Sequence, residues 1–186
     1  MPSIPRCWRF IIVLSTVAAV LAGGSGAYYR WAYPYGSSHS CDKALMFAFG
    51  DYARDHGGAY PAGEATPEAS LSLLYPRYVD AEVIRGKTVP TQVVQSILDR
   101  GERLGPDTCG WHYVAGLRSD DDPRLALCWD KVGLRHFGER LSDGGHFVIF
   151  VNPTHVEYIE GAKWAEFLEE QKKLHEERKE KMAKNG

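Results

Sequence analysis

Histidine and aspartate side chains gather in the last third of the chain, where their types suit a metal ion. The candidate ligands are His136, His146 and Asp143, with Asp130 as an alternative carboxylate. A catalytic zinc needs three such ligands and one open position. The chain lacks the H-E-x-x-H motif that places two histidines on one helical face. We therefore expect strand-end histidines that donate to loop carbonyls and hold no metal, and keep a metal-assisted hydrolase as the alternative.

A second candidate is a run of three acidic residues, Asp120 to Asp122, which resembles part of a calcium-binding loop. An EF-hand loop also needs a central glycine and a bidentate glutamate, and this segment offers neither at the required spacing. We expect a solvated turn that ends at Pro123. No cofactor is predicted, with calcium at this turn as the alternative.

A third kind of chemistry is disulfide formation, because three cysteines lie in the part of the chain that follows the apolar N-terminus. Cys109 and Cys128 flank neighbouring expected strands, and a disulfide between them would contribute roughly 3 kcal/mol. Disulfides persist outside the cytoplasm. Cys41 is an alternative partner for either, and all three are equally suited to remain buried thiols. The sequence leaves the pairing open.

Motifs of nucleophilic catalysis and of phosphate binding are missing from the sequence. The chain has no G-x-S-x-G, no P-loop and no G-x-G-x-x-G after an expected strand. Its net charge of -2 lacks the cationic excess that nucleic-acid binding requires. Hydrophobic residues make up 44% and charged residues 25%, as in folded globular proteins. These features favour a folded protein that is not an enzyme and does not bind nucleic acid.

The N-terminal segment 10–29 contains no charged residue, and as a helix it would extend about 30 Å, the thickness of a bilayer core. Arg6 and Arg9 precede it, which places the N-terminus in the cytoplasm. The segment predicts a single-pass protein of the inner (cytoplasmic) membrane whose domain is periplasmic or otherwise extracytoplasmic. A cleaved signal peptide, with small residues at Ser25 to Ala27, is the alternative. An aromatic belt for the outer interface follows: Tyr28, Tyr29, Trp31, Tyr33 and Tyr35.

Helical periodicity begins after an expected linker at residues 30–39. Apolar residues recur with a helical period over 40–55, and the glycines that follow favour a helix end. Thr66 and Thr91 are the expected N-caps of two further helices. A charged helix is expected at the C-terminus and should project into solvent beyond Leu174. These elements divide the chain into an anchor or signal segment, a linker, a folded domain and a charged C-terminal helix, over 1–29, 30–39, 40–168 and 169–186.

From Gly110 onward, polar and apolar residues alternate with a period of two, which predicts three or four antiparallel strands. The turn Asn152 to Thr154 should join the last two. Alternation should place Leu125, Leu127 and Trp129 together on one face. In the third strand it separates Phe147, Ile149 and Val151 from Val148 and Phe150. The predicted fold class is α+β, with an amphipathic helix packed on a small antiparallel sheet.

Three local motifs resemble type IV pilin-like proteins, in particular the type II secretion pseudopilins and the pseudopilin-like families of planctomycete-type bacteria. Gly58–Pro61 resembles the family's G-x-[YF]-P, and Leu73–Val79 resembles its L-x-P-x-Y-[IV] segment. Asp143–Ile159, preceded by His136, resembles its closing hairpin. The chain lacks the family's prepilin cleavage motif, because no glycine precedes Phe10 and no acidic residue lies within the apolar segment.

The resemblance implies a pilin-like fold on a plain membrane anchor. It also implies a non-catalytic structural or assembly role, with other envelope or secretion proteins as partners. A further alternative is an extracytoplasmic module that binds a glycan or peptide. Its stacking platform would be an exposed aromatic side chain from the set Tyr60, Trp111 and Trp129.

Overall fold

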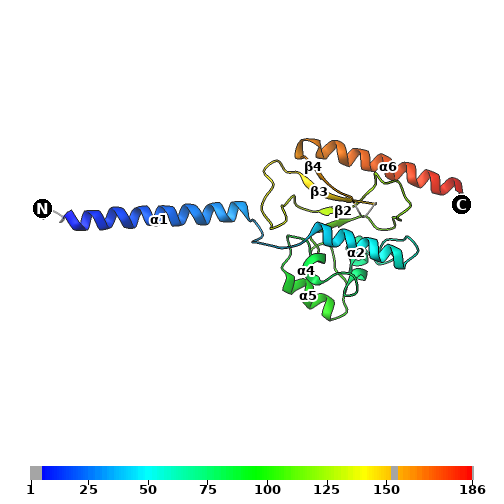
Figure 1. Ribbon diagram of the computed structural model, residues 1–186, viewed down its shortest axis with the longest axis horizontal. Coiled ribbons are helices and arrows are strands. Elements are labelled where there is room, and N and C mark those ends of the chain that lie inside the picture. Colours follow the sequence, from blue (N-terminus) through cyan, green and yellow to red (C-terminus); the bar gives the residue numbers. More distant parts are fainter. Residues whose placement is uncertain (1–5, 152–154, 186) are drawn as a thin grey trace.

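The computed structural model describes residues 6–151 and 155–185. It begins with helix α1 (Arg6–Ala32), which projects away from the remainder of the chain (Figure 1). The segment Ile11–Ala32 is long and apolar enough to cross a membrane, and residues 11–31 are exposed, whereas Ala32 is buried against the domain. The expected linker at 30–39 is shorter than predicted, because residues 30–32 complete the last turn of α1.

Helix α2 (Asp42–Asp55) confirms the amphipathic helix expected over 40–55. The buried residues of α2 include Leu45, Met46, Phe49 and Tyr52. The buried face is wider than a single stripe because α2 lies between the sheet and a group of short helices (Figure 1). In this position α2 forms the centre of the larger core.

The short helices are α3 (Pro67–Leu71), a 3₁₀ turn (Ser72–Leu74), α4 (Ala81–Ile84) and α5 (Thr91–Asp99). Thr66 caps α3 as predicted, because its hydroxyl accepts a hydrogen bond from the Ala69 amide at 3.1 Å. The predicted cap of α5 is wrong, since Pro90 occupies the N-cap position and Thr91 is already helical. Helix α4 was not predicted, because a single turn is too short to show a period.

Four antiparallel strands form one sheet in the order β1-β2-β3-β4, which confirms the α+β class. They are β1 (Trp111–Tyr113), β2 (Ala126–Asp130), β3 (His146–Phe150) and β4 (Val156–Ile159). The expected turn at residues 152–154 lies outside the described residues. The strands on either side of it pair as predicted, with Ile149 opposite Val156.

A bulge in β2 overturns one predicted face. Ala126 lies opposite Phe150 and Cys128 lies opposite Ile149, so β2 has one residue more than its partner at Leu127. An extra residue reverses the alternation beyond it. Leu127 therefore faces α2 as expected, whereas Trp129 faces the other side together with Ala126.

The second face of the sheet is covered by helix α6 (Trp164–Asn185), which follows a short 3₁₀ turn (Gly161–Lys163) (Figure 1). Phe167 of α6 packs on Val148 and Phe150, while Ile149 and Val151 join the α2 core as predicted. The expectation that α6 projects into solvent beyond Leu174 holds only for residues 179–184, which are exposed. Arg178 forms an ion pair with Asp121 at 2.9 Å, which holds the preceding part of the helix on the domain.

Candidate functional site

The predicted metal ligands are dispersed among separate contacts. His136 lies against His39, with 3.2 Å between their Nε2 atoms. Asp143 accepts a hydrogen bond from the hydroxyl of Tyr158 at 2.6 Å. His146 donates from Nδ1 to the backbone oxygen of Asp130 at 2.9 Å, and its burial lowers its pKa. Within residues 6–151 and 155–185, no three His, Cys, Asp or Glu side chains converge in a metal-binding geometry.

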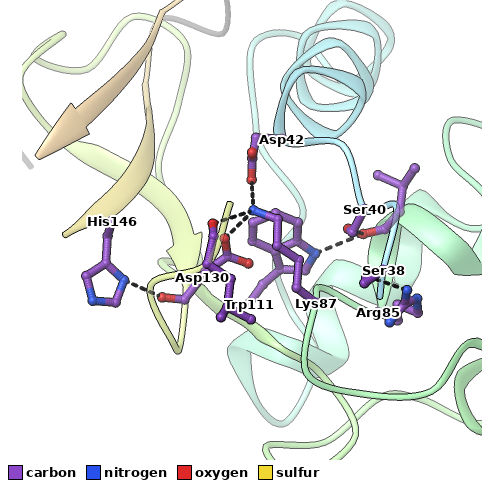
Figure 2. Close-up of polar contacts among 10 residues, drawn as sticks. Ser38, Ser40, Asp42, Arg85, Lys87, Trp111, Asp130 and His146 are labelled. Carbon is purple, nitrogen blue, oxygen red and sulfur yellow. Dashed lines mark hydrogen bonds and ion pairs between the residues drawn. The ribbon is translucent and has the colours of Figure 1, made fainter. Parts of the chain in front are cut away.

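A buried ion cluster that sequence reasoning missed lies where α2 meets the sheet. Lys87, on the segment between α4 and α5, is completely buried and points between two carboxylates (Figure 2). Its Nζ lies 2.8 Å from Oδ1 of Asp42, the first residue of α2, and 2.5 Å from Oδ2 of Asp130, the last residue of β2. A third hydrogen bond runs to the backbone oxygen of Leu134 at 3.4 Å. All three protons of the ammonium group therefore have acceptors.

In this cluster, burial and the neighbouring opposite charges have opposing effects on the pKa of Lys87 and of Asp130. Burial alone would lower the pKa of Lys87, but Asp130 and Asp42 outweigh it and raise that pKa above its ordinary value. Burial raises the pKa of Asp130 to about 7, against the opposing effect of Lys87. One cation thus faces two carboxylates in a low-dielectric site, which favours a proton on Asp130 near neutral pH. The Oδ1 atom of Asp130 is buried and has no hydrogen-bond partner among residues 6–151 and 155–185.

Aromatic rings close this cluster from solvent. The Lys87 ammonium lies 5.6 Å from the ring centre of Trp111 and 5.9 Å from that of Phe147. Trp111 is itself fixed, because its Nε1 donates to the backbone oxygen of Val83 at 2.9 Å. A nucleophilic lysine needs a lowered pKa and access to substrate, and Lys87 has neither. The cluster instead joins α2, the segment after α4 and the sheet.

No sequence pattern marks this cluster. Lys87 stands between Gly86 and Thr88 in an ordinary polar segment, and its partners lie 45 residues before it and 43 residues after it. The neighbouring Arg85 is also buried and donates to the hydroxyl of Ser38 at 2.6 Å. Two cations so close together in a loop normally indicate a solvated surface. Only the folded arrangement reveals that both are internal.

A groove of about 1020 Å³ lies between α6 and the β1–β2 side of the sheet. Two histidines stack on its tryptophans: His112 on Trp129 with 4.2 Å between ring centres, and His146 on Trp164 with 4.0 Å. Two of the cations that line the groove are paired with carboxylates outside it, Lys131 with Glu68 at 2.8 Å and Arg178 with Asp121 at 2.9 Å. The groove has the shape for a ligand, but these two cations are already engaged.

The proposed stacking platforms are not exposed, which corrects the binding-module hypothesis. Tyr60 and Trp111 are 1% and 0% exposed, and Trp129 is 9% exposed. The Tyr60 hydroxyl donates to the backbone oxygen of Val151, and Tyr60 is enclosed beside Phe49. These rings serve the interior of the fold, and a glycan would have no free face to stack on.

Each aspartate of the Asp120–Asp122 run is paired with an arginine. The three ion pairs are Asp120 with Arg118 at 3.1 Å, Asp121 with Arg178 at 2.9 Å and Asp122 with Arg124 at 2.7 Å. Hydrogen bonds from Arg124 lower the pKa of Asp122 to about 2. Calcium would have to displace these arginines to use the carboxylates, so the run is a charge-paired loop in this arrangement.

Cys41, Cys109 and Cys128 are free thiols, so the structure does not contain the Cys109–Cys128 disulfide. The strand register explains why. Tyr113 lies opposite Cys128, whereas Cys109 precedes β1 and its Sγ lies 3.8 Å from the backbone oxygen of Ile84. Burial raises the pKa of the Cys109 thiol to about 12, which keeps it protonated.

Comparisons with known proteins supply no relative. No family model, no curated protein and no solved structure matches this chain. The pilin-like resemblance therefore stays a prediction, and function has to be argued from the geometry alone.

Proposed function

We propose that this chain is a non-catalytic envelope protein whose α1 crosses the inner membrane once. Its pilin-like domain lies outside the cytoplasm and binds other proteins of an envelope or secretion assembly. The observation that carries this proposal is the exposure of the apolar residues 11–31 of α1, beside a domain that has a buried hydrophobic core. An apolar surface of this size is stable in lipid and costly in water.

The apolar side chains of α1 point in every direction around the helix axis, as in a membrane span and unlike an amphipathic surface helix. Burying one such side chain contributes about 1.5 to 3 kcal/mol, so the bilayer is the natural environment for the set. The exposed large side chains are Trp8, Ile11, Ile12, Val13, Leu14, Val17, Val20, Leu21, Tyr28, Tyr29 and Trp31.

The arrangement of the domain supports the pilin-like part of the proposal. Helix α2 lies across an antiparallel meander, and the Gly58–Pro61 motif follows it directly. Gly58 has a φ of +86°, and a Cβ there would lie 2.9 Å from the hydroxyl of Ser119. The Tyr60 amide donates to the backbone oxygen of Leu117 at 3.1 Å. The motif therefore acts as a packing element that fixes the end of α2 to the loop after β1.

The non-catalytic part of the proposal draws support from the best-formed polar cluster. Lys87 and Asp130 are closed from solvent, and the raised pKa of Lys87 opposes nucleophilic chemistry. The hydrolase alternative would require His136, His146 and Asp143 to leave their present partners and converge. At present each of these three side chains has its own separate hydrogen-bond partner, and the three do not meet in one site.

We expect the mature protein to stay in the membrane after carbonate extraction and to begin at or near Met1. Detergent should release it, because α1 is held by the hydrocarbon core. The measurement is fractionation followed by intact-mass analysis of the extracted protein. A soluble product that begins at Tyr28 would instead establish a cleaved signal peptide and remove the anchor.

A further inference from the structure

The loop between β2 and β3 returns to the end of α1 and contacts its last residues. The Arg140 amide donates to the backbone oxygen of Ala32 at 2.7 Å, and its Nε donates to that of Trp31 at 3.2 Å. The last carbonyls of a helix have no donors within the helix, and a cation there also meets the negative end of the dipole. Arg140 thus caps α1 and couples it to the domain. Ala32 is buried by this contact.

The same loop is packed against the residues that follow α1. The Ser38 amide donates to the backbone oxygen of Phe137 at 3.0 Å, and the His39 ring lies 5.4 Å from that of Phe137. Gly138 adopts a φ of +83°, and a Cβ there would lie 2.8 Å from the backbone oxygen of Gly36. Several independent contacts therefore hold residues 135–140 at the end of the domain that faces α1 (Figure 1).

Apolar and cationic side chains share this end of the domain. Phe137 is 58% exposed although its backbone is held in place. Trp31, in the last turn of α1, and Tyr35, in the segment that follows it, are also exposed. Aromatic rings and arginines are the residues that favour the boundary between hydrocarbon and headgroups. The charged residues of segments 28–40 and 135–140 are Arg30, Arg135 and Arg140 against Glu139.

The position of α1 decides what this surface meets. Its apolar segment ends at Ala32, and about 20 helical residues already cross the hydrocarbon core. Arg140 binds the last two residues of that segment directly, so its loop lies at headgroup depth when α1 spans the bilayer. A protein partner would have to enter the headgroup layer to reach the same residues.

We infer that residues 28–40 and 135–140 form a membrane-contact surface that holds the domain against the bilayer. Phe137 enters the interface, and the arginines bind the phosphates of anionic lipids. This inference rests on the proposed membrane anchoring and adds that the domain lies on the bilayer. A domain tethered by a free linker would instead hang away from the lipid.

The test uses the full chain reconstituted into vesicles of phosphatidylcholine and phosphatidylglycerol. Phe137→Cys is labelled with an environment-sensitive fluorophore in a Cys7→Ser, Cys41→Ser background, where the buried Cys109 and Cys128 remain unlabelled. The matched control is Met182→Cys, since Met182 is 60% exposed near the far end of α6. Quenching by lipids that carry a spin label at the headgroup reports the depth of each probe.

We expect the probe at position 137 to emit at shorter wavelength and to lose intensity with spin-labelled lipid, while the probe at 182 keeps an aqueous spectrum. Equal, aqueous spectra at both positions in protein that floats with the vesicles would overturn the membrane-contact surface, and a protein partner would then be the better occupant. Failure of the chain to float with the vesicles would instead overturn the anchoring itself.

Discussion

Replacing Lys87 with methionine is expected to lower the free energy of unfolding by about 3 to 5 kcal/mol, because the carboxyl groups of Asp42 and Asp130 lose the cation that lies between them. Asp130 is 1% exposed and Asp42 is 9% exposed, so water cannot replace the ammonium group. Urea unfolding of the detergent-solubilised full chain, followed by tryptophan fluorescence, measures the change. The control is Lys43→Met, which removes an exposed lysine from α2 and should leave the free energy nearly unchanged.

The difference in unfolding free energy between the native protein and Lys87→Met should grow as pH rises above about 7. Even in the native cluster the pKa of Asp130 is raised to about 7 by burial, and removal of the cation raises it further. A carboxyl whose folded pKa lies above its unfolded value binds more protons when folded. Its contribution is therefore complete at low pH and is lost as pH rises through the folded pKa.

Restoring charge balance provides the decisive comparison for this cluster. Asp42→Asn and Asp130→Asn in the Lys87→Met background should recover part of the stability and flatten its pH dependence, because no buried carboxylate remains. A Lys87→Met protein with native stability at all pH values would mean that the cluster does not hold α2 to the sheet.

Phe49→Ala is expected to cost about 3 to 5 kcal/mol, the range for removing a buried aromatic ring. Phe49 is completely buried, and its ring stacks on Tyr113 with 5.4 Å between centres. Phe47 offers a matched control on the same helix, because it is 62% exposed. Phe47→Ala should change stability little. Equal losses from both variants would contradict the orientation of α2 against the sheet.

Elements with a long, regular pattern were predictable from the sequence. The apolar run predicted α1, the helical period predicted α2, and alternation predicted the strands of the sheet. Thr66 predicted the start of α3, since a capping hydroxyl acts on the next turn and needs no distant partner. Each of these signals is local, so the chain displays it without reference to the fold.

Features that depend on distant partners were not predictable. Lys87 becomes a buried residue only because Asp42 and Asp130 approach from other elements. The bulge at Leu127 depends on how β2 pairs with β3, and it moved Trp129 to the opposite face. Arg178 holds α6 to the domain through Asp121, and a charged helix in isolation gives no sign of that contact.

The candidate metal site could not be judged from the sequence for the same reason, because it depends on contacts between distant residues. His136, His146 and Asp143 are neighbours in sequence, but the loop, β3 and the turn before it direct them to different partners. Residue type alone cannot establish convergence. The Cys109–Cys128 bridge was excluded by strand register, which the spacing of the two cysteines in sequence did not contain.

The central claim is that α1 crosses the membrane once and leaves the domain outside the cytoplasm. Protease protection in sealed vesicles of known orientation tests it most directly, with an epitope placed after the exposed end of α6. We expect the epitope to survive in inside-out vesicles, to be removed from right-side-out vesicles, and to be lost from both when detergent opens them. Removal of the epitope from intact inside-out vesicles would instead place the domain in the cytoplasm.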